Sequence, residues 1–166
     1  RALHGSTVLY PADVVATEKI VAQAARQKGI VYIRTTRNAT PVIYKEGTAF
    51  PIGGSKVLRQ STGDIATIVA AGITVHEALA AYELLKKRKM FVRIIDAYSV
   101  KPLDITTLKK AARETRYIIT VEDHRAEGGL GEAVASALAG TGALVNGATF
   151  GVSALTGVDH LSLFRL

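Results

Sequence analysis

The chain has 166 residues, of which 48% are hydrophobic, and a formal net charge of +7 at pH 7. This size and hydrophobic content suit one folded domain, or one domain with part of another, and they exclude an intrinsically disordered chain. The absence of cysteine excludes disulfide bonds and thiolate metal sites. No apolar run is long enough to cross a bilayer, so no membrane partner is expected.

A strand, a helix and a second strand are predicted in the first 44 residues. The first strand covers residues 6–10 and the second covers residues 30–34. The helix between them runs over residues 11–28, with Asp13 as its N-cap. Together these elements form one βαβ unit. Residues 45–54 contain three glycines and a proline, which is typical of a linker.

The alternation of strands and helices resumes after this linker. Further strands are predicted over residues 56–59, 65–71, 91–96, 117–121 and 145–150, and helices are predicted to begin near Thr74, Pro102 and Glu132. Thr74 and Glu77 have the spacing of a capping box. Buried strands that alternate with amphipathic helices indicate an α/β fold, a doubly wound three-layer sheet.

The positive charge is densest at residues 86–89, where the second helix should end. Cations are favoured at a helix C-terminus, and no aromatic residues are interleaved with this run. We therefore predict a solvated helix end and no nucleic-acid partner. The first residue is not methionine and the last residues begin a helical pattern, so we expect part of a larger protein whose last helix is incomplete.

A polar patch follows the strand at residues 117–121. Glu122, Asp123 and His124 stand at the carboxyl end of this strand, where open α/β sheets meet ligands and partners. A metal or acid–base cluster is one interpretation. Neighbouring residues at a strand end point in different directions, so a hydrogen-bonded contact between domains or subunits is favoured, and no metal site is predicted. The glycines at 128–131 match a dinucleotide fingerprint only weakly and indicate a tight turn.

Arg37 is the candidate binding residue. It follows the strand at residues 30–34, and a guanidinium at a strand end can bind phosphate oxygens in a bidentate way. From the residues alone, an ordinary surface arginine is the simpler interpretation. Arg34 is expected to form a structural ion pair, and His76 to be an ordinary surface residue in the first turn of its helix.

Residues 120–134 read TVEDHRAEGGLGEAV. This run resembles the C-terminal portion of transketolases of the short, animal type, which carry V-E-D-H-x-x-E-G-G-[IL]-G-E-A-V. Residues 5–19, 69–79 and 101–104 are similar to the same family in the same order. The resemblance implies that residues 1–44 end a thiamine-diphosphate pyrimidine-binding domain. It implies that residues 45–54 are a linker and that residues 55–166 are the C-terminal domain.

The resemblance also implies a function. The complete enzyme would be a cytoplasmic homodimer that uses thiamine diphosphate and Mg²⁺ to move a two-carbon ketol unit between sugar phosphates. Arg37 would contact the substrate phosphate, although Asn38, Ala39 and Thr40 replace the Pro-Glu-Asn that often follows in the family. The Gly-Asp-Gly segment that holds magnesium and the glutamate that acts on the aminopyrimidine are not in this chain. We therefore expect no catalytic, cofactor-binding or metal-binding residue here, and an N-terminal part or subunit as partner.

Two alternatives remain open. The chain could belong to another thiamine-diphosphate enzyme, of the deoxyxylulose-phosphate synthase or 2-oxoacid dehydrogenase beta type. It could also be a non-catalytic α/β module for assembly or for binding a small anion.

Overall fold

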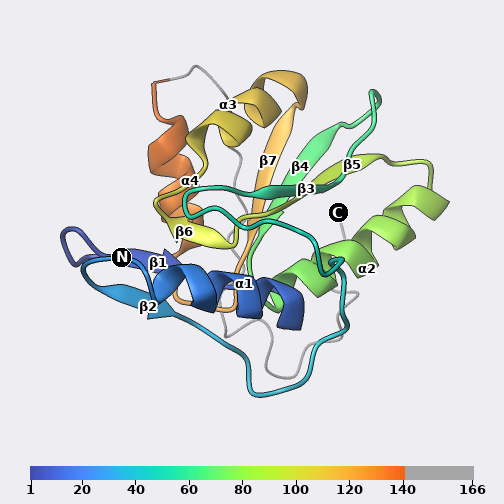
Figure 1. Cartoon of the computed structure of the whole chain (residues 1–166). Helices are drawn as coiled ribbons and strands as arrows, with labels where there is room; N and C mark the ends of the chain where they lie inside the picture. Colours follow the sequence, from blue (N-terminus) through green and yellow to red (C-terminus); the bar gives the residue numbers. More distant parts are fainter. Residues whose placement is uncertain (141–166) are drawn as a thin grey trace.

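The structure is a computed structural model that describes residues 1–140 (Figure 1). In chain order its elements are β1 (Thr7–Leu9), α1 (Val14–Ala24), β2 (Val31–Ile33), β3 (Lys56–Arg59), β4 (Ala66–Ala70), α2 (Thr74–Lys87), β5 (Val92–Asp96), β6 (Ser99–Lys101), α3 (Ile105–Glu114), β7 (Tyr117–Val121) and α4 (Leu130–Leu138). The predicted strand at residues 145–150 and the incomplete last helix lie outside the described residues. None of the described helices is both long enough and apolar enough to cross a membrane.

The larger sheet has four strands in the order β3-β5-β4-β7. β4 is parallel to both of its neighbours, and β3 is an antiparallel edge strand. Every residue of β4 and β5 is buried, as a strand covered on both faces requires. Ala66, Ile68 and Ala70 pack toward Val75 and Ala78 of α2.

The opposite face of this sheet is covered by α3 and α4 (Figure 1). Val69 and Ile95 pack there against Leu108 of α3 and against Val134 and Leu138 of α4. Successive residues of β4 therefore belong to apolar clusters on opposite faces of the sheet. The result is three layers, with α2 on one face of the sheet and α3 and α4 on the other. This arrangement confirms the predicted α/β class.

The smaller sheet has the order β2-β1-β6. β1 and β2 are parallel and are connected by α1, as the predicted βαβ unit requires. β6 is antiparallel to β1. The sequence analysis did not predict β6. β6 connects residues 1–44, hereafter the N-terminal unit, to residues 55–140, hereafter the C-terminal unit. The division of the whole chain into domains stays a prediction.

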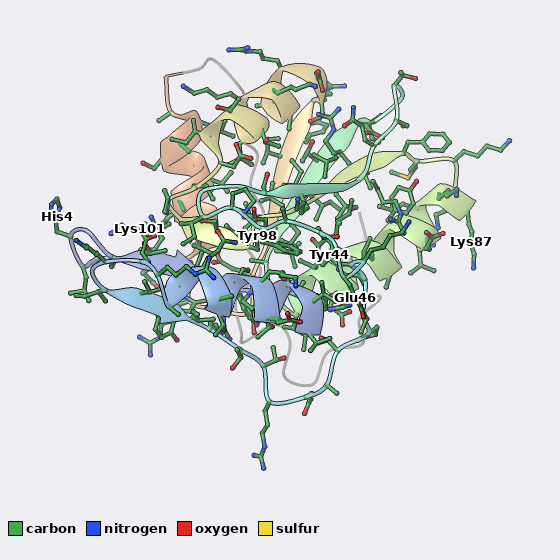
Figure 2. The ribbon with its side chains drawn as sticks, in the orientation of Figure 1. His4, Tyr44, Glu46, Lys87, Tyr98 and Lys101 are labelled. Carbon is green, nitrogen blue, oxygen red and sulfur yellow. The ribbon has the colours of Figure 1, made fainter. Side chains whose placement is uncertain are left out.

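Residues 45–54 are irregular but packed. Phe50 is 1% exposed and makes edge-to-face contacts with Tyr44 and Tyr98, both of which lie near the middle of the molecule (Figure 2). The Gln23 amide of α1 donates to the Phe50 carbonyl at 2.6 Å. This segment therefore fixes α1 to the C-terminal unit.

Two local predictions were wrong. α1 ends at Ala24, four residues before the predicted end. The capping box does not form, because Ile73 is the N-cap of α2 and supplies no side-chain hydrogen bond. The Thr74 hydroxyl instead lies 2.9 Å from the Ala71 and Val121 carbonyl oxygens, where it links β4 and β7. The basic run behaves as predicted at its start, since Lys87 is the exposed last residue of α2 (Figure 2).

Candidate functional site

A hollow of about 310 Å³ separates the first turn of α1 from the loop that follows β2. The loop, residues 35–40, contributes three threonines and one asparagine to the lining. The residues that line the hollow are Pro11, Ala12, Asp13, Val14, Thr17, Thr35, Thr36, Asn38, Ala39 and Thr40. Asp13 is the one charged residue among these lining residues, and the polar groups beside it belong to threonine and asparagine.

Asp13 builds one side of this hollow. Its Oδ1 accepts from the Ala16 amide at 2.8 Å, which confirms Asp13 as the N-cap of α1. Its Oδ2 accepts from the amides of Ile43 at 2.8 Å and Tyr44 at 2.9 Å. The same carboxylate therefore caps the helix and holds the chain where it returns from the loop.

Arg37 lies at the middle of the loop, between two residues that line the hollow. Its side chain is exposed. Within residues 1–140 its guanidinium has no hydrogen bond or ion pair. An exposed guanidinium without a partner among the described residues is available to bind an anion. The predicted phosphate contact itself stays a prediction.

Arg34 makes the structural ion pair that the sequence predicted. Its Nη1 and Nη2 donate to Oδ1 and Oδ2 of Asp123 at 2.9 and 2.7 Å, and Nη2 also donates to the Asp123 carbonyl at 3.0 Å. The guanidinium carbon lies 4.7 Å from the centroid of the Tyr10 ring, and the Tyr10 hydroxyl donates to Asp123 at 3.1 Å. Burial, together with the Asp123 charge, raises the pKa of Tyr10 to about 12. The polar patch after β7 is thus a contact between the two units.

The other two residues of the polar patch point elsewhere. Glu122 is 4% exposed and accepts from the amides of Leu130 at 2.5 Å and Gly131 at 3.3 Å, so it caps α4. Burial raises the pKa of Glu122, although these amide hydrogen bonds oppose the rise. His124 is exposed, and its Nδ1 lies 2.9 Å from the Arg125 carbonyl oxygen. Among residues 1–140, no group of three or more His, Cys, Asp or Glu side chains could hold a metal ion.

The tight glycine turn has a clear cause. A side chain at Gly129 would overlap the carboxylate of Glu122 and the carbonyl oxygen of Arg125. The glycine therefore permits the close approach that lets Glu122 reach the first amides of α4. This confirms the interpretation of residues 128–131 as a close backbone approach rather than a dinucleotide loop.

Two further contacts join the units and were missed by sequence reasoning. His76 is half-buried, with Nε2 2.8 Å from the Ala12 carbonyl oxygen, so the prediction of an ordinary surface histidine was wrong. Asp96 is fully buried at the end of β5 and accepts from the Tyr44 hydroxyl at 2.6 Å. Its Oδ1 has no hydrogen-bond partner in the described part of the chain, and burial raises the pKa of Asp96 to about 7. The signal in the sequence was an acid at the carboxyl end of a largely apolar strand.

Comparison with known proteins agrees with this geometry. The family model "Transketolase, C-terminal domain" matches residues 55–162. The chain belongs to the transketolase family. Human transketolase is 50% identical over 141 residues, which are 84% of this chain and 23% of the human protein. Transketolase-like protein 1 of Macaca fascicularis is 50% identical over 139 residues, which are 83% of this chain and 23% of that protein.

Solved transketolase structures resemble the chain as well. A split gene transketolase, described as an inactive beta4 tetramer, superimposes with a TM-score of 0.85 and 36% identity, over 91% of this chain and 49% of that one. The transketolase of Campylobacter jejuni gives a TM-score of 0.66 at 17% identity, over 91% of this chain and 22% of that one, and shows the fold alone. The chain thus spans about a quarter of the human transketolase that it matches.

Proposed function

We propose that this chain supplies the C-terminal portion of a thiamine-diphosphate-dependent transketolase, which moves a two-carbon ketol unit between sugar phosphates. The observation that carries the proposal is the exposed Arg37 guanidinium, which has no hydrogen bond or ion pair within residues 1–140 and belongs to the loop that lines the hollow at the start of α1. It stands in a chain that is 50% identical to human transketolase over 141 residues. Other parts of the protein would perform the bond-making chemistry.

Arg37 is the residue proposed to bind the substrate phosphate. A guanidinium presents a planar pair of N–H donors that matches two phosphate oxygens, and it stays charged at any physiological pH. The net charge of +7 favours the approach of an anionic sugar.

Thiamine diphosphate and Mg²⁺ are proposed as cofactors held by other parts of the protein. The described residues do not fit them, because they form no group of metal-binding side chains. The buried carboxylates of Asp13 and Glu122 already accept hydrogen bonds from backbone amides. No step of the cofactor chemistry is therefore assigned to these residues.

The partners proposed are an N-terminal portion or subunit and a second copy of the assembled protein. Support comes from the greater length of the relatives, of which this chain covers 23% in the human protein and 49% in the split gene chain. Cytoplasmic location and a place in sugar-phosphate metabolism are proposed on family membership alone.

The test combines this chain with the N-terminal portion of the same protein. The assembly should transfer a ketol unit from a ketose phosphate to an aldose phosphate when thiamine diphosphate and Mg²⁺ are added. The chain alone should show no transfer. An assembly that forms, binds the cofactor and still transfers nothing with any sugar phosphate would favour the alternative, a module for assembly or small-anion binding.

A further inference from the structure

We propose that Asp123 is a positioning residue for the substrate-binding loop, and that the C-terminal unit thereby sets the affinity of the enzyme for phosphorylated substrates. Asp123 acts through Arg34, which directly follows β2 and precedes the loop. The inference rests on the proposed role of Arg37, and it extends that role by naming what holds Arg37 in place.

The first step is how the loop is held. The Arg34 amide donates to the Leu9 carbonyl at 2.9 Å, which is the last hydrogen bond between β2 and β1. The next hydrogen bond to another part of the described chain comes from the Thr40 hydroxyl, which donates to the Ala12 carbonyl at 3.0 Å. Between these anchors the only side-chain hydrogen bond within residues 1–140 is local, from the Thr36 hydroxyl to the Asn38 carbonyl. Arg37 therefore stands midway along a segment that is fixed at its two ends.

The second step is what fixes the first anchor. The Arg34 guanidinium makes three hydrogen bonds of 2.7 to 3.0 Å, and all of them go to Asp123. The two side chains are 30% and 17% exposed, so water competes with this pair less than with a surface pair. A bidentate pair also restricts orientation, because two parallel hydrogen bonds define the plane of the guanidinium.

The third step is that the aromatic support of this pair is itself rigid. Tyr10 is 5% exposed, stacks on Arg34 and donates to Asp123. Its ring packs directly on Gly72, where a β-carbon would overlap the ring and where φ is +59°. The three side chains of Tyr10, Arg34 and Asp123 therefore form one fixed unit, hereafter the clamp, at the base of the loop.

The fourth step is that the C-terminal unit also holds Ala12, which lines the hollow and anchors the far end of the loop. His76, in the first turn of α2, donates from Nε2 to the Ala12 carbonyl at 2.8 Å. Ala12 also accepts from Thr40 at the far end of the loop. Both ends of the loop thus depend on side chains of the C-terminal unit, although the hollow is lined only by the N-terminal unit.

The kinetic test uses the enzyme assembled from this chain and its N-terminal portion. Asp123→Asn keeps the size of the side chain but loses its charge and one acceptor. It should raise KM for phosphorylated substrates about tenfold, leave kcat within about twofold, and leave unphosphorylated substrates unchanged. Glu127→Gln is the matched control, because it neutralises an exposed acid of the same segment that lies outside the clamp, and it should match the parent enzyme.

A conservative variant of Arg34 and a double variant distinguish a positioning role of Asp123 from a general loss of structure. Arg34→Lys keeps the charge without the planar fork and should raise KM less than Asp123→Asn does. The double variant should be no worse than Asp123→Asn alone, because both changes remove the same contact. If Asp123→Asn does not fold, Tyr10→Phe removes only the hydroxyl contact and should raise KM in the same direction. An equal loss with phosphorylated and unphosphorylated substrates would overturn the proposal.

A second measurement is independent of substrate. Since this chain has no cysteine, Asn38→Cys and Lys87→Cys would place two spin labels on each copy of it, one on the loop and one at the end of α2. Asp123→Asn should broaden the distance distribution between the labels, whereas Glu127→Gln should not. An unchanged distribution overturns the positioning role. A broadened distribution with an unchanged KM for phosphorylated substrates means instead that Arg37 does not bind the phosphate, which refutes the proposed role of Arg37.

Discussion

Removal of the Arg37 guanidinium is the most direct test of the proposed substrate site. In the assembled enzyme, Arg37→Ala should raise KM for sugar phosphates because it removes a charge-assisted contact to a dianion. Arg37 is exposed and has no partner within residues 1–140, so its removal leaves no buried group unpaired in that part of the chain. The loss in activity should therefore reflect the substrate contact rather than damage to the fold.

The magnitude follows from the chemistry of the contact. A hydrogen bond to a charged group contributes about 1.5–3 kcal/mol. This corresponds to a decrease of about tenfold to a hundredfold in kcat/KM. Arg37→Lys should recover only part of the loss, since an ammonium group lacks the planar pair of donors. The free energy of unfolding should change by no more than about 0.5 kcal/mol, as for other surface substitutions.

The assay compares matched substrates with and without phosphate. Steady-state kinetics with the parent enzyme and both variants should show the loss only for phosphorylated sugars, because unphosphorylated sugars offer no partner to the guanidinium. Thermal unfolding of each variant serves as the control for folding. If both substrate classes lose activity equally, Arg37 supports the structure of the loop and the reasoning about the phosphate is refuted.

Three other predictions concern the buried acid, the glycine turn and the cofactor. Asp96 has a pKa near 7 in the folded chain, well above its ordinary value of 3.8. Between these two values the folded state holds a proton that the unfolded state releases. The stability that this proton provides is present below about pH 4 and is lost as pH rises through about 7. Urea unfolding should therefore show Asp96→Asn gaining stability relative to the parent between pH 5 and 8, and a constant difference would contradict the assignment. Gly129→Ala should lower the free energy of unfolding by about 1–3 kcal/mol because its β-carbon overlaps Glu122, whereas Gly47→Ala, which has open space around it, should change it by no more than about 0.5 kcal/mol. Calorimetry of the chain alone with thiamine diphosphate and Mg²⁺ should detect no binding, and low-micromolar affinity would refute the assignment of the cofactor to other parts of the protein.

The sequence predicted the elements whose signals are local. β7 has the predicted bounds, and Asp13 is the predicted N-cap of α1. An apolar strand or a helix cap depends on residues within one or two turns, so its pattern can be found without knowing the fold. The capping box predicted at Thr74 does not form, because a distant contact overrides the local pattern. The Thr74 hydroxyl donates to the Val121 carbonyl of β7, which is 47 residues away in the sequence.

The contacts between the two units could not be predicted in this way. Arg34 was expected to form an ion pair, yet its partner lies 89 residues away. The pairs His76–Ala12 and Tyr44–Asp96 span 64 and 52 residues. No local pattern identifies such partners, because they depend on how the two sheets are placed against each other. The proposed loop could be located from sequence, but the clamp that holds its base could not.

These contacts share one position in the fold, and this position bears on where the substrate can bind. Asp96 ends β5, Asp123 follows β7, and His76 stands in the helix turn that follows β4. All three therefore lie at the carboxyl edge of the parallel strands, which is the edge where open α/β sheets usually bind ligands. Here that edge is covered by the N-terminal unit. The four-stranded sheet thus uses its ligand edge to contact the N-terminal unit, and the hollow and the loop that carries Arg37 lie on the N-terminal unit instead. Mutations at this edge should consequently alter substrate binding through the docked unit, although no side chain of the sheet lines the hollow.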